Sequence, residues 1–158
     1  MGVIQRIIIP IVALGIAFGV ARLIKAPRNI IKGAIVAGAV FATGNFLIDL
    51  AAIHFSIWHY EMEGLILGTP VDLYLSAGIL FGSVTSLVFW WLESKPRYLL
   101  YSYLIVLPVL TTMRDYLSAR YVYTMLIWDS PYYLVFDFMA WIVLLAITFM
   151  VFRFTRAL

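Results

Sequence analysis

Residues 70–91 read PVDLYLSAGILFGSVTSLVFWW, and this stretch decides the fold. It carries one charged residue, Asp72, close to its start. A continuous apolar run of about twenty residues is long enough for a helix to cross the hydrocarbon core of a membrane. A strand of a transmembrane barrel would instead alternate apolar and polar residues. The stretch therefore predicts a membrane-spanning helix.

Four further apolar runs lie on either side of this stretch, at about residues 4–24, 31–53, 98–116 and 131–152. The chain of 158 residues is 65% apolar and only 12% charged, whereas about a quarter of the residues of a soluble domain are charged. We therefore predict one all-α domain over residues 1–158, a polytopic transmembrane helical bundle of about five spans. Cysteine is absent, which excludes disulfides and cysteine-ligated metal sites.

The basic residues predict the topology. If the chain crosses five times, one side of the membrane receives eight basic residues and the other side receives Arg6, Arg114 and Arg120. Because basic residues gather on the cytoplasmic side, we expect the amino terminus outside, the carboxyl terminus inside and a location in the plasma membrane. This also accounts for the net charge of +3 without nucleic acid as a partner. The eight are Arg22, Lys25, Arg28, Lys32, Lys95, Arg97, Arg153 and Arg156.

Seven of the eight acidic residues lie at or toward the other, outer side. Ionisable residues inside a membrane are costly, so they are candidates for a functional site. We predict Asp49, Asp72 and Asp137 as catalytic residues, because a dry site disfavours the charged form of a carboxyl group and lets it act as a general acid. Asp72 has an equally simple interpretation as a carboxylate that stabilises the start of a helix. Asp115 is a further candidate, but for it we favour an interfacial ion pair, since Arg114 is its neighbour and Arg120 lies about a turn away.

Aromatic residues gather in two segments near these acids, and one polar residue shares a helix face with Asp49 at a spacing of four. The faces of aromatic rings can stabilise a developing carbocation by cation–π attraction. The alternative is that these residues belong to the aromatic belts found at membrane interfaces. The predicted substrate-binding residues are Asn45, Trp58, Tyr60, Trp128 and Trp141.

Two spans are expected to start in the same way, at Thr69-Pro70 and at Ser130-Pro131, with a hydroxyl N-cap and a proline at the first helical position. Each start follows an acid near the end of a span and an aromatic loop, so this order of features occurs twice. A GxxxG pattern at residues 15–19 predicts a close contact between helices.

The histidines give little sign of a metal site. His59 lies close to Glu61 and Glu63, and we interpret this cluster as an ordinary solvated loop. The sequence contains no glycine-rich phosphate loop, nucleophile elbow or dinucleotide-binding fingerprint. We therefore predict no metal and no other cofactor.

Residues 46–50 read FLIDL, residues 57–60 read IWHY and residues 64–75 read GLILGTPVDLYL. This order resembles the lycopene cyclase domain of membrane-embedded carotenoid cyclases. That family typically has an aspartate at a helix end, a tryptophan with a second aromatic residue, a glycine, and a proline followed by acidic residues. The resemblance implies that Asp72 donates a proton to a polyene double bond and that Asp49 is its partner. Leu73 departs from the pattern, since the family often has a second acid there.

We therefore expect an integral membrane enzyme, an intramolecular lyase or isomerase, that cyclises a lipid-soluble isoprenoid without redox chemistry. Asp72 would be the acid, with Asp49 and Asp137 as partner or base. The expected partners are membrane lipid and the hydrophobic substrate. The sequence leaves open whether the chain also forms a homo- or hetero-oligomer in the membrane. The alternative is a non-enzymatic accessory subunit, or a lipid- or pigment-binding scaffold, of a larger membrane complex. A small transporter is a weaker alternative, because the spans show no broken helix beyond their proline starts.

Overall fold

The computed structural model describes residues 3–61, 64–122 and 126–157, which form five helical rods and two short strands. The third rod is continuous, because the π-helix η1 joins α3 to α4, and α5 likewise continues into the π-helix η2. The elements are α1 (Val3–Leu23), α2 (Arg28–His54), β1 (Trp58–Tyr60), α3 (Val71–Ala77), η1 (Gly78–Val84), α4 (Thr85–Glu93), α5 (Arg97–Leu117), η2 (Ser118–Val122), β2 (Leu126–Trp128) and α6 (Tyr133–Thr155).

The helical class of the bundle is confirmed, and each predicted span coincides with a helical rod to within a few residues. Three helices begin directly after Pro27, Pro70 and Pro96. Proline fixes its own φ angle and disfavours a helical conformation in the residue before it, so these boundaries can be seen in the sequence. The two strands lie in segments that the sequence analysis treated as aromatic loops.

The hydroxyl caps predicted at two helix starts are wrong. Thr69 Oγ1 donates a hydrogen bond to the Ile66 carbonyl oxygen at 2.7 Å, and Pro70 occupies the N-cap position of α3 without a side-chain cap. Ser130 Oγ accepts a hydrogen bond from the Tyr132 backbone N–H at 3.2 Å, but α6 begins only at Tyr133. Both hydroxyl groups stabilise the turn before the helix, and the helix starts after it.

Three helices of the described residues are long and apolar enough to cross a membrane, namely Arg28–His54, Leu73–Glu93 and Tyr133–Thr155. The apolar part of α1, Ile8–Leu23, is shorter. Large apolar side chains also cover the outer surface, among them Phe18, Ile105 and Met150, each more than 60% exposed. An exposed apolar surface of this extent is unusual for a soluble monomer. The structure therefore supports a membrane protein.

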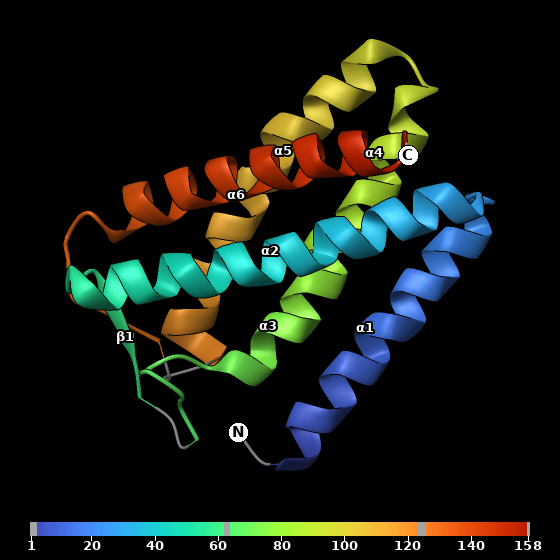
Figure 1. Ribbon diagram of the computed structural model, residues 1–158. Helices are drawn as coiled ribbons and strands as arrows, with labels where there is room; N and C mark the ends of the chain where they lie inside the picture. Colours follow the sequence, from blue (N-terminus) through green and yellow to red (C-terminus); the bar gives the residue numbers. More distant parts are fainter. Residues whose placement is uncertain (1–2, 62–63, 123–125, 158) are drawn as a thin grey trace.

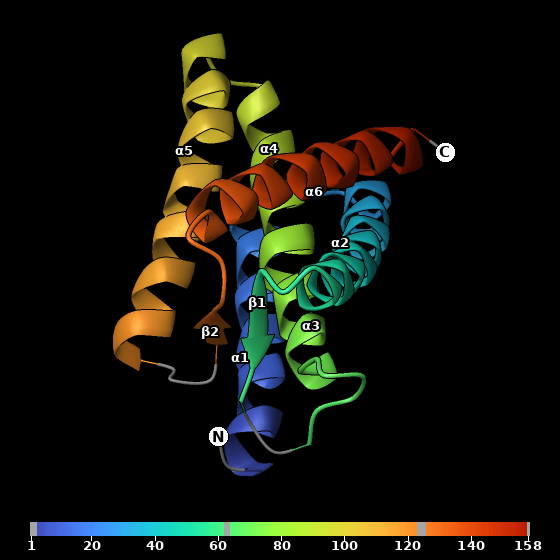
Figure 2. The same cartoon turned by 90° about the vertical axis from the view of Figure 1, so that its left-hand side faces the viewer.

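The rods form two crossing layers (Figures 1 and 2). Helices α2 and α6 lie side by side and cross the central rod α3–η1–α4, which is flanked by α1 and α5. The β1–β2 sheet and the starts of α1 and α3 lie toward one end of the bundle, and the α1–α2 and α4–α5 connections lie at the other end (Figure 1).

The tightest helix contact joins α2 to η1 through glycines. A Cβ atom added to Gly82 would lie 2.6 Å from the Gly38 Cα atom, and one added to Gly78 would lie 2.6 Å from the Gly38 carbonyl oxygen. The close contact predicted at Gly15 and Gly19 is wrong, because a Cβ at either position meets nothing within 4 Å. The GxxxG spacing that brings backbones together is instead at residues 78–82.

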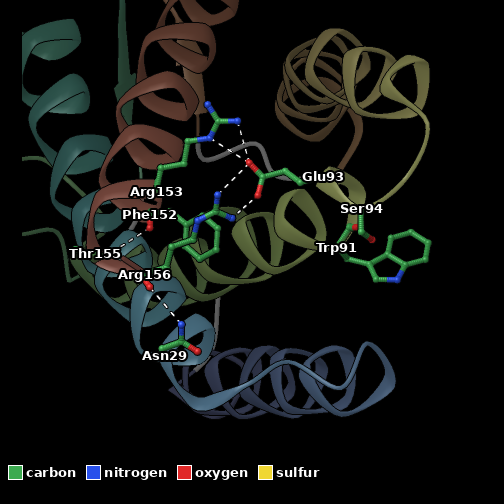
Figure 3. Close-up of polar contacts among 8 residues, drawn as sticks. All are labelled: Asn29, Trp91, Glu93, Ser94, Phe152, Arg153, Thr155 and Arg156. Carbon is green, nitrogen blue, oxygen red and sulfur yellow. Dashed lines mark hydrogen bonds and ion pairs between the residues drawn. The ribbon is translucent and has the colours of Figure 1, made fainter. Parts of the chain in front are cut away.

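One acid ties the helix ends together at the basic end of the bundle (Figure 3). Arg153 donates to Glu93 Oε1 from Nη2 at 2.8 Å and from Nε at 3.1 Å. Arg156 donates to the same carboxylate, and its carbonyl oxygen accepts a hydrogen bond from Asn29 Nδ2 at 3.2 Å. Glu93 thus fixes the end of α4 to the end of α6, and Asn29 adds the start of α2.

Candidate functional site

Asp49, near the end of α2, is only 4% exposed and has three hydrogen-bond donors. Trp58 Nε1 donates to its Oδ1 at 3.1 Å, and Tyr60 Oη donates to its Oδ2 at 2.9 Å. The Tyr74 hydroxyl, from α3, donates to the same Oδ2. Because alternate residues of a strand share one face, β1 directs Trp58 and Tyr60 to the same carboxylate. Asp49 therefore joins α2, β1 and α3.

The aromatic loops of the two similar segments pair with each other. Strands β1 and β2 are antiparallel, with Trp58 opposite Trp128 and their rings 5.7 Å apart in an edge-on arrangement. The Trp128 ring also stacks on Tyr133 at 4.5 Å. An isolated pair of three-residue strands is marginal in water. The sheet is held in place by these rings and by the hydrogen bonds to Asp49.

A second group of charged residues lies between α5 and α6. Asp115 accepts hydrogen bonds from Arg114 Nε at 2.9 Å and from Trp141 Nε1 at 2.8 Å, which confirms the predicted ion pair of Asp115 with Arg114. The Arg114 guanidinium lies 4.3 Å from the centre of the Phe81 ring, a cation–π contact. Asp137 is 8% exposed, and its Oδ2 atom has no hydrogen-bond partner among the described residues.

Asp49, Asp115 and Asp137 line one small cavity of about 90 Å³. Residues of α2, β1, α3, α5, β2 and α6 form its walls. A larger cavity of about 340 Å³ adjoins it and shares six lining residues with it. The larger cavity is mostly apolar, with Ile9, Leu73, Leu80 and Phe81 among its walls. The shared residues are Asn45, Tyr60, Ala77, Arg114, Asp115 and Leu126.

The structure brings most of the predicted site residues together. Asp49 and Asp137 line the smaller cavity, and so do all five residues predicted to bind substrate, Asn45, Trp58, Tyr60, Trp128 and Trp141. The backbone of Asp72 lies in the first turn of α3, but its side chain lies outside the described part of the structure. Its neighbours Leu73 and Tyr74 line the larger cavity.

Two members of the site were predicted incompletely from the sequence. Tyr74 was not singled out, although it follows the Thr69-Pro70 turn within the first helical turn, close to a conspicuous acid. Asp115 was interpreted as an interfacial ion pair, whereas it also lines both cavities and binds the Trp141 indole. Asp115 lies near the end of a span, after an uncharged run, and Asp49 lies in the same kind of place. This similarity was the sequence signal that could have indicated a site role for Asp115.

No group of three or more His, Asp or Glu side chains among the described residues is placed to hold a metal ion. His59 and Glu61 lie 3.6 Å apart, but Glu63, the third member of the cluster noted in the sequence, lies outside the described residues. The closer partner of His59 is Asp129, at 2.7 Å. This pair connects the outward face of β1 to the residue that follows β2.

We predict that this pair sets the pH response of the sheet. The hydrogen bond to Asp129 raises the pKa of His59 above its ordinary value of 6.5. A raised pKa in the folded state means that the pair stabilises the sheet fully below the ordinary value and stops doing so as the pH rises through the raised value. In an NMR titration, Asp129→Asn should bring the pKa of His59 back toward 6.5, and Glu61→Gln should move it less. An unchanged His59 pKa in Asp129→Asn would contradict this.

Comparisons of the chain with protein-family models, with curated proteins and with solved structures find no match. Its function is therefore inferred from the residues around the two cavities.

Proposed function

We propose that the protein is an integral membrane enzyme that cyclises a lipid-soluble isoprenoid by acid catalysis and without redox chemistry. The observation that carries the proposal is the convergence of Asp49, Asp115 and Asp137 with three tryptophan rings on one cavity that adjoins a larger apolar one. Ligand sites are typically apolar cavities with a few polar groups that fix orientation. The resemblance of residues 46–75 to the lycopene cyclase domain points to the same chemistry.

The hydrogen bonds divide the roles among the acids. Asp137 is the proton donor, since its Oδ2 atom has no direct hydrogen bond from a described residue, and the hydroxyl close to its carboxyl group is that of Thr112. Asp49 accepts three hydrogen bonds, so it fixes the walls of the cavity and serves as partner. Asp115, held by Arg114 and Trp141, is placed to receive the proton that the product cation loses. Asp72 is kept as a second candidate donor, because the helical turn that carries it borders the larger cavity.

The aromatic residues stabilise the cation formed between these two proton transfers. Trp58, Trp128 and Trp141 all line the smaller cavity, on three different elements. A cation near the face of an aromatic ring gains about 0.5–2 kcal/mol, and more when water is excluded. Rings on several sides of one cavity therefore favour a carbocation over its neutral precursor.

The proposal predicts that Asp137→Asn abolishes product formation. The full chain is expressed in a host that accumulates acyclic isoprenoids, and lipid extracts are analysed for cyclised isomers. Removing a general acid lowers the rate by about 10²–10⁴-fold, so the product should fall below detection. Asp72→Asn and Asp49→Asn are tested alongside, with Glu61→Gln as the control, because Glu61 is exposed and outside both cavities. Unchanged product in all three aspartate variants would defeat the proposal.

One observation favours a non-enzymatic role, as an accessory subunit or scaffold. Asp49 and Asp115 already have hydrogen-bond partners within the fold, as expected of acids that only hold a bundle together. Purification in a mild detergent separates the two functions. Stoichiometric recovery with large unrelated subunits supports the scaffold, whereas an isolated bundle that forms product supports the enzyme.

The proposal includes a topology of five spans in the plasma membrane, with the amino terminus outside and the carboxyl terminus inside. Because the chain has no cysteine, single cysteines report the side of the membrane directly. Glu61→Cys, beside β1, should react in intact cells with a maleimide that cannot cross membranes. Lys95→Cys, between α4 and α5, should react only after the cells are opened. The reverse labelling pattern would show that the topology is the opposite of the proposed one.

A further inference from the structure

Two polar atoms beside the smaller cavity have no hydrogen-bond partner among the described residues. They are Asp137 Oδ2 and Trp128 Nε1, and both residues line the cavity. Asp137 is more than nine-tenths buried, and the indole nitrogen of Trp128 is itself buried. A buried polar group without a partner is costly, so such groups call for a specific explanation. A ligand that satisfies both is one such explanation.

The hydrogen-bonding character of the two atoms defines the ligand. An indole N–H can only donate, whereas a carboxyl oxygen accepts, or donates when it is protonated. A hydrocarbon satisfies neither group, and an ether oxygen can only accept. A hydroxyl group can accept from the indole of Trp128 and form a hydrogen bond of either direction with Asp137.

The charges of the cavity walls disfavour an anionic head group. Asp49, Asp115 and Asp137 line the smaller cavity, and Arg114 is the one basic residue among its described walls. Arg114 is already paired with Asp115. A phosphate or diphosphate would be repelled by the remaining carboxyl groups when they are charged. A neutral hydroxyl group meets no such repulsion.

We infer that the ligand of this site is an allylic prenyl alcohol, with its hydroxyl between Trp128 and Asp137 and its tail in the larger cavity. The inference rests on the proposed function and names its substrate class. The larger cavity, at about 340 Å³, is within the size range of small-molecule sites. Its apolar walls suit one hydrocarbon tail. Because the two cavities share lining residues, the tail of the ligand can lie in the larger cavity while its hydroxyl group lies in the smaller one.

The chemistry follows from these positions and balances in atoms and electrons. Asp137 gives its proton to the hydroxyl oxygen, and the C–O bond breaks with both electrons leaving on water, which yields an allylic cation. A distal double bond of the tail supplies the electron pair of the new ring bond. The ring cation then loses a proton to a carboxylate such as that of Asp115. The alcohol becomes a cyclic hydrocarbon and one water, with no change in oxidation level.

Binding to the full chain in lipid nanodiscs tests the inference. Farnesol, farnesyl methyl ether, farnesene and farnesyl diphosphate are titrated by calorimetry, and the signal from empty nanodiscs is subtracted. Farnesol should bind about fivefold to tenfold more tightly than each of the other three, since one hydrogen bond is worth up to about a factor of ten. Equal binding of farnesene, or tighter binding of the diphosphate, would overturn the inference.

Trp128→Phe is the decisive variant, because it keeps an aromatic ring and removes the N–H group. It should lower the affinity for farnesol about fivefold to tenfold and leave that for farnesene unchanged. Thr112→Val is the matched control. The Thr112 hydroxyl is also buried and lies close to Asp137, but Thr112 does not line the cavity. An equal loss of farnesol affinity in Thr112→Val would overturn the inference.

The binding assay tests this inference and the product assay tests the proposed function, so a negative result in one can be distinguished from a negative result in the other. Selective binding of farnesol without a cyclic product supports this inference and counts against the proposed function. A cyclic product from an acyclic hydrocarbon, without preference for farnesol, supports the proposed function and overturns this inference.

Discussion

Gly82→Ala is expected to destabilise the protein by about 3 kcal/mol, at the upper end of the usual cost of overpacking. The added Cβ would lie 2.6 Å from the Gly38 Cα atom and 2.8 Å from the Phe41 Cβ atom. Because the first of these atoms is backbone, the clash cannot be relieved by turning a side chain. Helices α2 and η1 must move apart, which opens the core around Phe41. Thermal unfolding in detergent, followed by circular dichroism, measures the loss.

Gly15→Ala is the matched control for this prediction. A Cβ at Gly15 meets nothing within 4 Å, and alanine is a better helix former than glycine by about 1 kcal/mol in water. This variant should therefore be as stable as the original chain or more so. If Gly82→Ala proved as stable as Gly15→Ala, the close contact between α2 and η1 would not exist.

Asp49→Leu is expected to cost about 3 kcal/mol or more of stability. It leaves the Trp58 indole and the Tyr60 and Tyr74 hydroxyl groups without their acceptor, and each buried unpaired group costs about 1–3 kcal/mol. The β1 strand should detach from α2 and α3, because these hydrogen bonds join the three elements. Thermal unfolding measures the stability, and faster hydrogen exchange at residues 57–60 would report the detachment.

Asp49→Asn separates this structural role from a catalytic one. The amide keeps one acceptor oxygen, and a tyrosine hydroxyl can turn to accept from its NH₂ group. We therefore expect a smaller loss of stability, about 1 kcal/mol, with the sheet still in place. A product yield that falls in this folded variant points to a role of Asp49 in the reaction. If Asp49→Leu were no less stable than Asp49→Asn, the three hydrogen bonds would not hold the fold.

The predicted helices and the observed ones agree because local features set their limits. Apolar runs of about twenty residues define each rod, and Pro27, Pro70 and Pro96 mark where three of them begin. The small sheet was not predicted, since its strands have three residues each and pair across about 70 residues of chain. Such short strands carry too little periodicity to be distinguished from loops.

The candidate site was predicted in its residue types and only partly in its arrangement. Costly acids inside spans and aromatic residues beside them identified Asp49 and Asp137, whose side chains do line one cavity. Asp115 was assigned to a simpler ion pair, because its neighbour Arg114 supplied a sufficient partner in the sequence. Trp141 was predicted only as a substrate-binding residue, whereas its indole also donates a hydrogen bond to Asp115 on α5.

The sequence by itself determined that this is a helical protein of membrane character, where its helical rods lie to within a few residues, and which few residues are charged. These properties depend on contiguous residues, on the cost of placing charges in lipid and on the geometry of proline. Only the tertiary structure decided which acids share a cavity, which glycines bring two backbones together and which carboxyl oxygen has no hydrogen-bond partner among the described residues. Those outcomes depend on how far each helix is rotated about its axis and on where distant strands pair, and long-range packing alone sets both.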